Sequence, residues 1–353
     1  MEELIKKYRI EKPKLESLKI SVLGLLPILI EKPNDKSIIH LIAGRVKDEE
    51  SLQKKIIRKE GKYNSLSDIT DIVGIRIITY LESQVDYVSK IIESEFIIDK
   101  VNSTDKRKVA TNEFGYKSLH FIVSMSEDRC KLPEYKNFNS IKFEVQIRSI
   151  LQHAWAEIEH DLGYKSNIEV PDTLKRNFSR LSALLEIADV EFDKLKKELV
   201  SYEISLPKLI QNSPEEVEIN KASLISFKQT NKTLINARKK IIIEGATFVN
   251  FAFGYEILIY SCNYLGLTMV SQLEEVLKNE GDKYLKFVEK FISKVKDKYV
   301  NGISESIELM YLLHYIAAKT QNEREVSNYL AFYSSKNNLL SAKGIIELFK
   351  SLE

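Results

Sequence analysis

Aliphatic residues are concentrated in short runs between residues 72 and 147. Residues 72–80 are nearly all Ile and Val, which predicts a strand buried on both faces. Shorter apolar runs predict three more strands, at 96–101, 119–125 and 141–147. Periodic patterns around them predict helices over 47–59, 86–96 and 149–160. Strands interleaved with helices are typical of a mixed sheet flanked by helices, so we expect an α+β domain.

Helical patterns flank this region on both sides. Residues 1–40 hold an amphipathic opening and an apolar run that Pro27 interrupts, and we expect a helical segment there. Beyond residue 171, Asp172 has an N-capping side chain, and apolar residues then recur every three or four positions, which predicts one long helix. These residues are Leu174, Phe178, Leu181, Leu184, Leu185, Ala188, Phe192, Leu195 and Leu199. The sequence thus predicts three parts: a helical segment at 1–40, the α+β domain at 41–170, and an all-helical region at 171–353.

The composition is that of a globular protein with two domains. The chain has 353 residues, 44% hydrophobic and 29% charged, which is enough to bury a core. Its formal net charge of +2 excludes a whole-chain polycation, so any contact with nucleic acid must come from local basic clusters. Two such clusters lie at 54–62 and 106–108, although a solvated helix face and a charged loop give the same composition.

We expect a cytoplasmic protein that does not enter a membrane. Its two cysteines, Cys130 and Cys262, are far apart in sequence, as is usual in a reducing compartment. Residues 1–16 lack the apolar core of a signal peptide. Residues 241–270 are strongly apolar, but acidic and amide residues interrupt them, so a pair of buried helices is expected there.

Two of the predicted strands carry polar residues along one face. Because side chains alternate along a strand, Glu144, Gln146 and Arg148 share a face, and Phe143, Val145 and Ile147 share the other. In the same way, Tyr116, Ser118 and His120 project together. A sheet edge that faces water, or a hairpin with one polar face, would give the same pattern, so these rows indicate a site only in combination with other features.

Carboxylates near these strands suggest a metal site. Asp68 and Asp71 precede the buried strand at 72–80, and Glu144 lies on a different strand. Carboxylates together with substrate phosphates are a usual ligand set for Mg²⁺. Helix or turn capping is the alternative for either aspartate. With the basic residues near Arg45 and Arg76, this inventory suits phosphoryl transfer, which needs cations, a metal and alignment but no nucleophilic side chain.

Five sequence blocks, in order, resemble the RelA/SpoT synthetase domain. The resemblance covers about residues 40–166. The blocks are Gly44-Arg-Val-Lys47 with Ser51, Lys55 and Arg58; Asp71-Ile-Val-Gly-Ile-Arg76; Gly115-Tyr-Lys-Ser-Leu-His120; Glu144-Val-Gln-Ile-Arg148; and His153-Ala-Trp-Ala-Glu-Ile-Glu-His160 with Tyr164-Lys165. The resemblance implies a nucleotidyltransferase-like sheet and a GTP diphosphokinase. Such an enzyme transfers the β,γ-pyrophosphate of ATP to the 3′-hydroxyl of GDP or GTP, which gives (p)ppGpp and AMP.

The resemblance also implies roles for residues on the ATP side. Arg45 and Arg76 are expected to sandwich the adenine, a stacking role that suits planar guanidinium groups. Lys47, Lys55 and Arg58 are expected to hold the ATP phosphates.

For the metal and the acceptor, the resemblance implies a second set of residues. Asp71 and Glu144 are expected to hold Mg²⁺, and Glu144 to assist deprotonation of the attacking hydroxyl. Asp71 and Arg76 have opposite parity on a regular strand, which a bend at Gly74 or a position of Asp71 before the strand would explain. The residues expected on the acceptor side are Tyr116, His120, Gln146, Arg148, His153 and Glu159.

Departures from the family pattern leave the acceptor open. Asn112 stands where many synthetases have a lysine that contacts the acceptor phosphates, and the basic residues 106–108 are a candidate substitute. The alternatives are a toxin-type enzyme that modifies the 3′ end of tRNA or makes adenosine alarmones, and an inactive nucleotide-binding sensor. Five histidines do not assemble the hydrolase metal site of the long bifunctional relatives. The helical region at 171–353 is expected to serve regulation, homo-oligomer formation or binding of an antitoxin.

Overall fold

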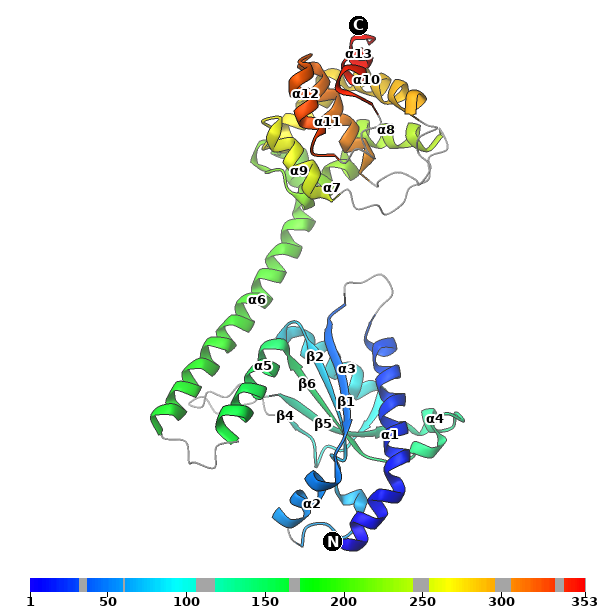
Figure 1. Ribbon diagram of the computed structural model, residues 1–353, viewed down its shortest axis with the longest axis vertical. Helices are drawn as coiled ribbons and strands as arrows, with labels where there is room; N and C mark the ends of the chain where they lie inside the picture. Colours follow the sequence, from blue (N-terminus) through cyan, green and yellow to red (C-terminus); the bar gives the residue numbers. More distant parts are fainter. Residues whose placement is uncertain are drawn as a thin grey trace. The chain divides into compact units, whose positions relative to one another are not determined.

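The computed structural model describes residues 1–31, 37–59, 61–105, 118–164, 172–243, 254–295, 306–333 and 340–352 (Figure 1). The chain forms two compact units, Met1–Lys196 and Lys197–Glu353. Each has its own hydrophobic core. The predicted sheet lies in the first unit, and the second unit is helical, as expected.

A six-stranded mixed sheet forms the centre of the first unit. Its order is β1 (Ile39–Val46), β2 (Val73–Thr79), β6 (Phe143–Ser149), β5 (Leu119–Met125) and β3 (Phe96–Ile98), and β4 (Thr104–Asp105) also pairs with β5. β2 and β6 are parallel, whereas the other neighbours are antiparallel. The predicted mixed sheet is therefore confirmed. β1 was not predicted, because it is partly exposed along its length and its aliphatic run, Leu41 to Ala43, is short and ends at Gly44 and Arg45.

One face of the sheet is the apolar core of the first unit. Side chains of β2, β5 and β6 on this face are almost fully buried together with those of α1 (Glu2–Ile30) and α3 (Glu82–Glu95). A Cβ on Gly44 would lie 2.8 Å from Ile75 Cδ1 of the neighbouring β2 and 3.0 Å from Lys19 Cγ of α1, so α1 packs closely against β1 at this position. Helix α1 is continuous through Pro13 and Pro27. The opposite face of the sheet is therefore left for polar side chains.

Two helices at the ends of strands border this polar face. Helix α2 (Glu49–Arg58) follows β1, and Asp48 caps it by accepting a 2.8 Å hydrogen bond from Ser51 N. Helix α5 (Ile150–Glu159) follows β6 directly, and Ser149 and Gln152 form its capping box. A π-helical turn, His160–Tyr164, ends α5. A short helix, α4 (Glu127–Cys130), follows β5.

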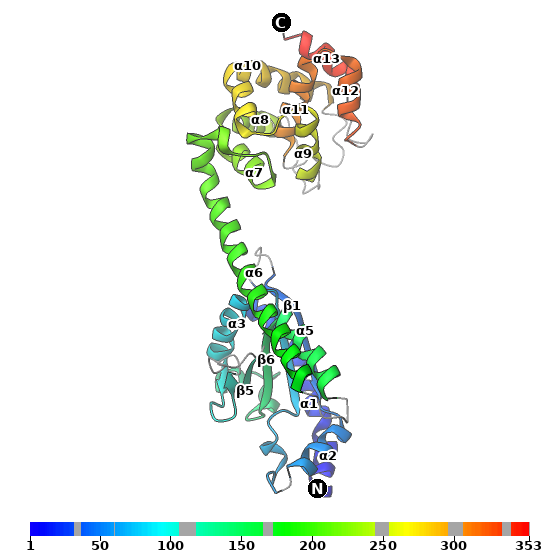
Figure 2. The ribbon, with the colours of Figure 1, turned by 90° about the vertical axis from the view of Figure 1, so that its left-hand side faces the viewer.

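The long predicted helix, α6 (Asp172–Asn212), begins in the first unit and not at a domain boundary. Ser149 Oγ donates a 2.6 Å hydrogen bond to Asp189, and Ser83 N donates one of 3.0 Å to Asp193. Figure 2 shows the first half of α6 running past α5, where the rings of Trp155 and Phe178 lie 5.7 Å apart. These contacts place residues up to Lys196 in the first unit, so the boundary expected at residue 171 moves into the helix.

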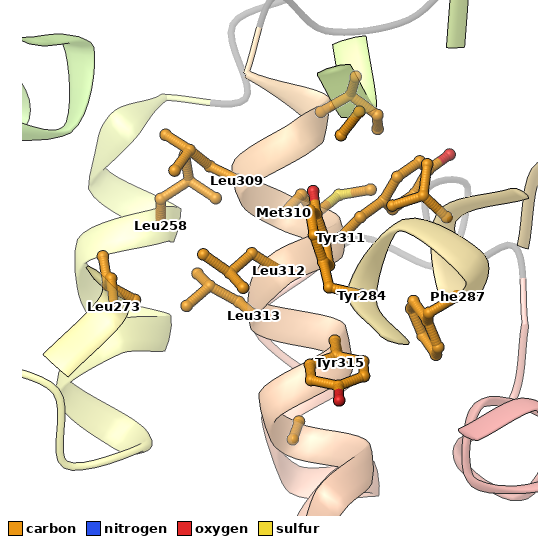
Figure 3. Packing of buried hydrophobic residues seen from close by; sticks show 14 of the residues in the cluster. Leu258, Leu273, Tyr284, Phe287, Leu309, Met310, Tyr311, Leu312, Leu313 and Tyr315 are labelled. Carbon is orange, nitrogen blue, oxygen red and sulfur yellow. The ribbon is translucent and has the colours of Figure 1, made fainter. Parts of the chain in front are cut away.

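The second unit is a bundle of helices around an aromatic and aliphatic core. Its helices after α6 are α7 (Lys221–Thr230), α8 (Lys232–Ile243), α9 (Tyr255–Tyr264), α10 (Val270–Val295), α11 (Ile307–Lys319), α12 (Glu323–Leu330) and α13 (Ala342–Lys350). Helix α11 is central to this core. In Figure 3, Leu312 and Leu313 point from one side of α11, and Tyr284 and Phe287 of α10 lie on its opposite side. Among the described residues, no helix has both the length and the apolarity that a bilayer crossing requires.

Candidate active site

The polar face of the sheet brings together residues from three strands. Gly74 on β2 pairs with Arg45 on β1 and with Glu144 on β6. Two residues further along β2, Arg76 pairs with Gln146. Since paired residues in adjacent strands point to the same side, all five belong to one face, as the alternation of the sequence predicted for Glu144 and Gln146.

A cavity of about 310 Å³ opens on this face. It is lined by Ala43, Gly44, Arg45, Lys47, Asp71, Gly74, Ile75, Arg76, His120, Glu144 and Gln146. Gly74 contributes to its floor, where a Cβ would meet no atom within 4 Å. The missing side chain leaves room between two arginines and two carboxylates, a combination suited to a polyphosphate nucleotide.

Asp71 is held by two lysines at one end of the cavity. It precedes β2, which begins at Val73, so the difference in parity from Arg76 is explained by its position before the strand. Lys55 Nζ on α2 lies 2.5 Å from Asp71 Oδ1, and Lys47 Nζ lies 3.3 Å from Oδ2. Burial raises the pKa of Asp71, but the two lysines outweigh it and leave that pKa below its ordinary value. Asp71 is therefore ionised at neutral pH.

Asp68, the other candidate carboxylate, serves as a cap. Its Oδ2 accepts backbone hydrogen bonds of 2.9 Å from Asn64 and 2.8 Å from Ser65. The capping alternative is therefore the correct one for Asp68.

The end of α2 carries an excess of positive charge. The pKa of Lys59 is lowered first by the charge of Lys62, and burial and the charges of Lys55 and Arg58 add to this effect. Arg58 itself is exposed. Arg9 on α1 forms a 2.6 Å ion pair with Glu49 in the first turn of α2. The predicted basic helix thus stands beside Asp71, with cations available to an anionic ligand.

Glu144 is enclosed by hydrogen-bond donors. His120 Nδ1 lies 2.8 Å from its Oε1, and Gln146 Nε2 donates a 2.8 Å hydrogen bond to its Oε2. Arg148 Nη2 in turn donates a 2.6 Å hydrogen bond to Gln146 Oε1. Burial raises the pKa of Glu144, but His120 and Gln146 outweigh it and keep that pKa below its ordinary value, although the charge of Asp71 opposes them.

Helix α5 approaches the site through His153 and Glu157. Glu157 Oε1 accepts a 2.8 Å hydrogen bond from Arg76 and lies 3.8 Å from His153 Nδ1. The pKa of His153 is lowered, first by burial and then by the charges of Arg148 and Arg76. The charge of Glu157 acts in the opposite direction but does not outweigh them. Sequence reasoning missed Glu157, although its position one helical turn after His153 could have revealed it.

Glu159 and Arg148 are predicted site residues that do not line the cavity, although Arg148 contacts Gln146. Glu159 is exposed, and its place two residues after Glu157 turns it by about 200° around the helix axis, away from Arg76. Arg148 is buried behind Gln146 and does not line the cavity. Tyr116, Asn112, Lys165 and the basic residues 106–108 lie outside the described residues.

The donor set of the cavity fits a hard divalent cation. Asp71 and Glu144 both line it, both are kept ionised, and the charge of Asp71 acts on Glu144. Within the described part of the chain, no three His, Cys, Asp or Glu side chains gather as a metal-binding cluster. Two carboxylates suit Mg²⁺, which usually completes its coordination with water and substrate phosphates.

Comparison with known proteins identifies the family. Residues 44–169 match the model of the region found in RelA / SpoT proteins. GTP pyrophosphokinase YwaC of Bacillus subtilis is 30% identical over 158 residues, which are 44% of this chain and 72% of that protein. GTP pyrophosphokinase YjbM of the same organism is 28% identical over 188 residues, 52% of this chain and 84% of that protein. The small alarmone synthetase 1 of Bacillus subtilis matches with a TM-score of 0.45 and 25% identity, over 57% of this chain and 100% of that one. The sequence matches, to YwaC and to the family model, show that the chain belongs to the RelA/SpoT family.

Proposed function

We propose that this protein transfers the β,γ-pyrophosphate of ATP to the 3′-hydroxyl of GDP or GTP, forming (p)ppGpp and AMP. The observation that carries the proposal is the single cavity in which Arg45, Arg76, Asp71 and Glu144 meet. The matched relatives are named GTP pyrophosphokinases, which agrees with this choice among phosphoryl-transfer reactions.

The ATP side is formed by β1, β2 and α2. Arg45 and Arg76 are diagonal neighbours on two paired strands, with Gly74 between them, so a flat adenine ring fits between their guanidinium planes. Lys47 and Lys55 form ion pairs with Asp71, and these ion pairs weaken when the two lysines bind the triphosphate. Arg58 adds a further cation from the exposed end of α2.

Asp71 and Glu144 are the residues that would hold Mg²⁺. When bound, the metal neutralises the phosphate charge and stabilises the leaving group. Glu144 also accepts the proton of the 3′-hydroxyl while the oxygen of that hydroxyl bonds to the β-phosphorus of ATP. The bond between that phosphorus and the oxygen of the α-phosphate breaks at the same step, and AMP leaves.

A transfer assay with a panel of acceptors tests this function. The full chain is incubated with γ-labelled ATP and Mg²⁺, and GDP, GTP, ATP or deacylated tRNA is supplied in turn. Label in (p)ppGpp is the expected outcome. Label only on tRNA or only on an adenosine nucleotide would show that the acceptor is not GDP or GTP. If no acceptor became labelled, the protein would be an inactive nucleotide-binding sensor and not a transferase.

We also propose that α6 joins two copies of this chain. Residues Leu181, Leu185, Ala188, Phe192 and Leu195 follow the alternating spacing of four and three that is typical of a coiled-coil seam. Leu181, Phe192 and Leu195 are each half exposed or more, while Ser182 and Asp189 on another side of the helix are buried. Because both copies would present the same seam, a second copy is the partner that fits it.

Light scattering after gel filtration measures this association directly. The wild-type chain is expected to elute at twice the mass of one chain or a multiple of it, and Leu181→Glu with Leu195→Glu is expected to elute as a monomer. Glu186→Lys, a change on the other side of α6, is the matched control. A wild-type monomer at micromolar concentration would refute this role of α6.

A further inference from the structure

A line of hydrogen-bonded side chains crosses the polar face on both sides of Glu144. Ser118 Oγ lies 2.7 Å from His120 Nε2, and His120 Nδ1 lies 2.8 Å from Glu144 Oε1. On the other side, Arg148 donates to Gln146, and Gln146 donates to Glu144 Oε2. Its residues lie on the antiparallel strands β5 and β6, in which His120 pairs with Gln146, and Ser118 directly precedes β5.

We propose that His120 and Arg148 are positioning residues, which fix the two carboxylate oxygens of Glu144 from opposite sides. This inference rests on the proposed function of Glu144, and it changes the expected role of both residues from contact with the acceptor to orientation of the carboxylate.

Arg148 determines how the Gln146 amide is oriented. An arginine side chain has donors and no acceptor, so only the oxygen of the amide can face it. The NH₂ group of Gln146 must then point to Glu144, as the observed distances have it. Arg148 is 6% exposed and does not line the cavity, so it is placed to act through Gln146 and not on a ligand.

Ser118 has the same effect on His120. A neutral imidazole carries one proton, and the ring can donate to Glu144 only if that proton is on Nδ1. The other nitrogen, Nε2, is then an acceptor, and the Ser118 hydroxyl is placed to donate to it. Ser118 is itself buried, which shields this hydrogen bond from water.

The two donors leave part of Glu144 free for the reaction. A carboxylate has about four acceptor positions on its two oxygens. His120 and Gln146 fill one on each oxygen, so one position on each oxygen is left, where the acceptor hydroxyl and Mg²⁺ would bind. Holding both oxygens limits rotation of the carboxylate, and misplacement by about 1 Å is enough to slow such a reaction about a hundredfold.

Matched variants of His120 separate orientation from binding. His120→Asn retains an N–H donor near the position of Nδ1, whereas His120→Leu removes it. In the full chain with ATP and GDP, His120→Leu is expected to lower kcat about tenfold or more with KM for both nucleotides within about twofold. His120→Asn is expected to have a kcat much closer to that of wild type than to that of His120→Leu. An Asn variant as slow as the Leu variant, or a rise in the KM of GDP with kcat unchanged, would overturn the proposal.

Arg148→Met tests the other side of the line, with its melting temperature checked against wild type. It is expected to lower kcat with little change in KM, and the double variant with His120→Leu is expected to lose less than the product of the single losses, because both act on one carboxylate. Fully multiplicative losses would show that the two residues act independently.

The tautomer of His120 gives a readout that does not depend on activity. In protein labelled with ¹⁵N-histidine, NMR distinguishes protonation at Nδ1 from protonation at Nε2, and His120→Asn assigns the signal. Protonation at Nδ1 is expected, and protonation at Nε2 would refute the arrangement even if the wild-type chain transferred no pyrophosphate. Failure of the proposed function is thereby distinguished from failure of this inference.

Discussion

Two glycines on neighbouring strands have different roles, since Gly74 leaves space for a ligand and Gly44 allows close packing of the core. Gly74 faces the cavity, and Gly44 allows α1 to approach the core face. We expect Gly74→Val to fold with a melting temperature near that of wild type, because valine suits a strand and its side chain enters open space. Affinity for ATP should fall about tenfold or more, since the side chain occupies the ligand's space. Equilibrium dialysis with ATP measures this, and undiminished binding would contradict the assignment of the cavity.

Gly44→Ala is expected to have the reverse effect. The added Cβ lies 2.8 Å from Ile75 Cδ1 on β2 and 3.0 Å from Lys19 Cγ on α1, so these side chains must shift against a packed core. Overpacking of this kind costs about 1–3 kcal/mol. Urea unfolding measures the loss, and a variant as stable as wild type would show that α1 can move freely.

Residue-level reasoning from sequence recovered the orientation of the site but not all of its partners. The alternation along β6 placed Glu144 and Gln146 on one face correctly, because strand parity is a local property. The roles of Arg148 and Glu157 depend on contacts with Gln146 and Arg76, which come from side-chain packing that periodicity does not encode.

At the scale of elements, α2 presents lysines to two different surroundings. Lys55 contacts Asp71, whereas Lys54 pairs with Glu50 on the exposed side of the same helix. We expect Lys55→Met to raise the KM for ATP about tenfold, because a cation on the phosphates is lost. Lys54→Met is the matched control and should leave KM unchanged. Equal effects of the two changes would show that the helix acts through its overall charge.

The attachment of α6 to the first unit is expected to depend on pH. Burial, with the charges of Glu82 and Asp193, raises the pKa of Asp189 to about 7. Because this pKa lies above its value in the unfolded chain, the folded state binds more protons between about pH 4 and 7. Stability should therefore fall as pH rises through this window, by at most about 1.4 kcal/mol per pH unit, and level off above pH 7.

Asp189→Asn provides the comparison for this effect. Asparagine keeps an oxygen for the hydrogen bond from Ser149 and carries no charge. Urea unfolding at pH 5 and pH 8 should show a smaller difference for the variant than for wild type. A wild-type chain that is more stable at pH 8 would contradict the assigned direction.

Elements with strong local patterns were predictable, and those defined by packing were not. β2, β5 and β6 are buried aliphatic runs, and α6 has a regular apolar repeat, so their sequences predict them. β1 is a partly exposed edge strand that α1 and β2 hold in place, and nothing in its own sequence requires it.

At the scale of the whole molecule, the two units have separate cores and one shared helix. Residues 1–212 contain the complete core of the first unit and all of α6. We therefore expect a chain ending at residue 212 to unfold cooperatively and to retain the transfer reaction, with any change in rate reflecting regulation by the second unit. Circular dichroism and the transfer assay test this, and a fragment without a cooperative transition would show that the first unit needs the second in order to fold.

The central claim is that the cavity between Asp71 and Glu144 transfers pyrophosphate, and ³¹P NMR of a single reaction mixture tests it most directly. With ATP, GDP and Mg²⁺, the wild-type chain should form AMP and a guanosine nucleotide with a new 3′-pyrophosphate in equal amounts. Asp71→Asn and Glu144→Gln should form neither product while melting near the wild-type temperature. Turnover retained in either variant, or AMP formed without the 3′-pyrophosphate, would contradict the account.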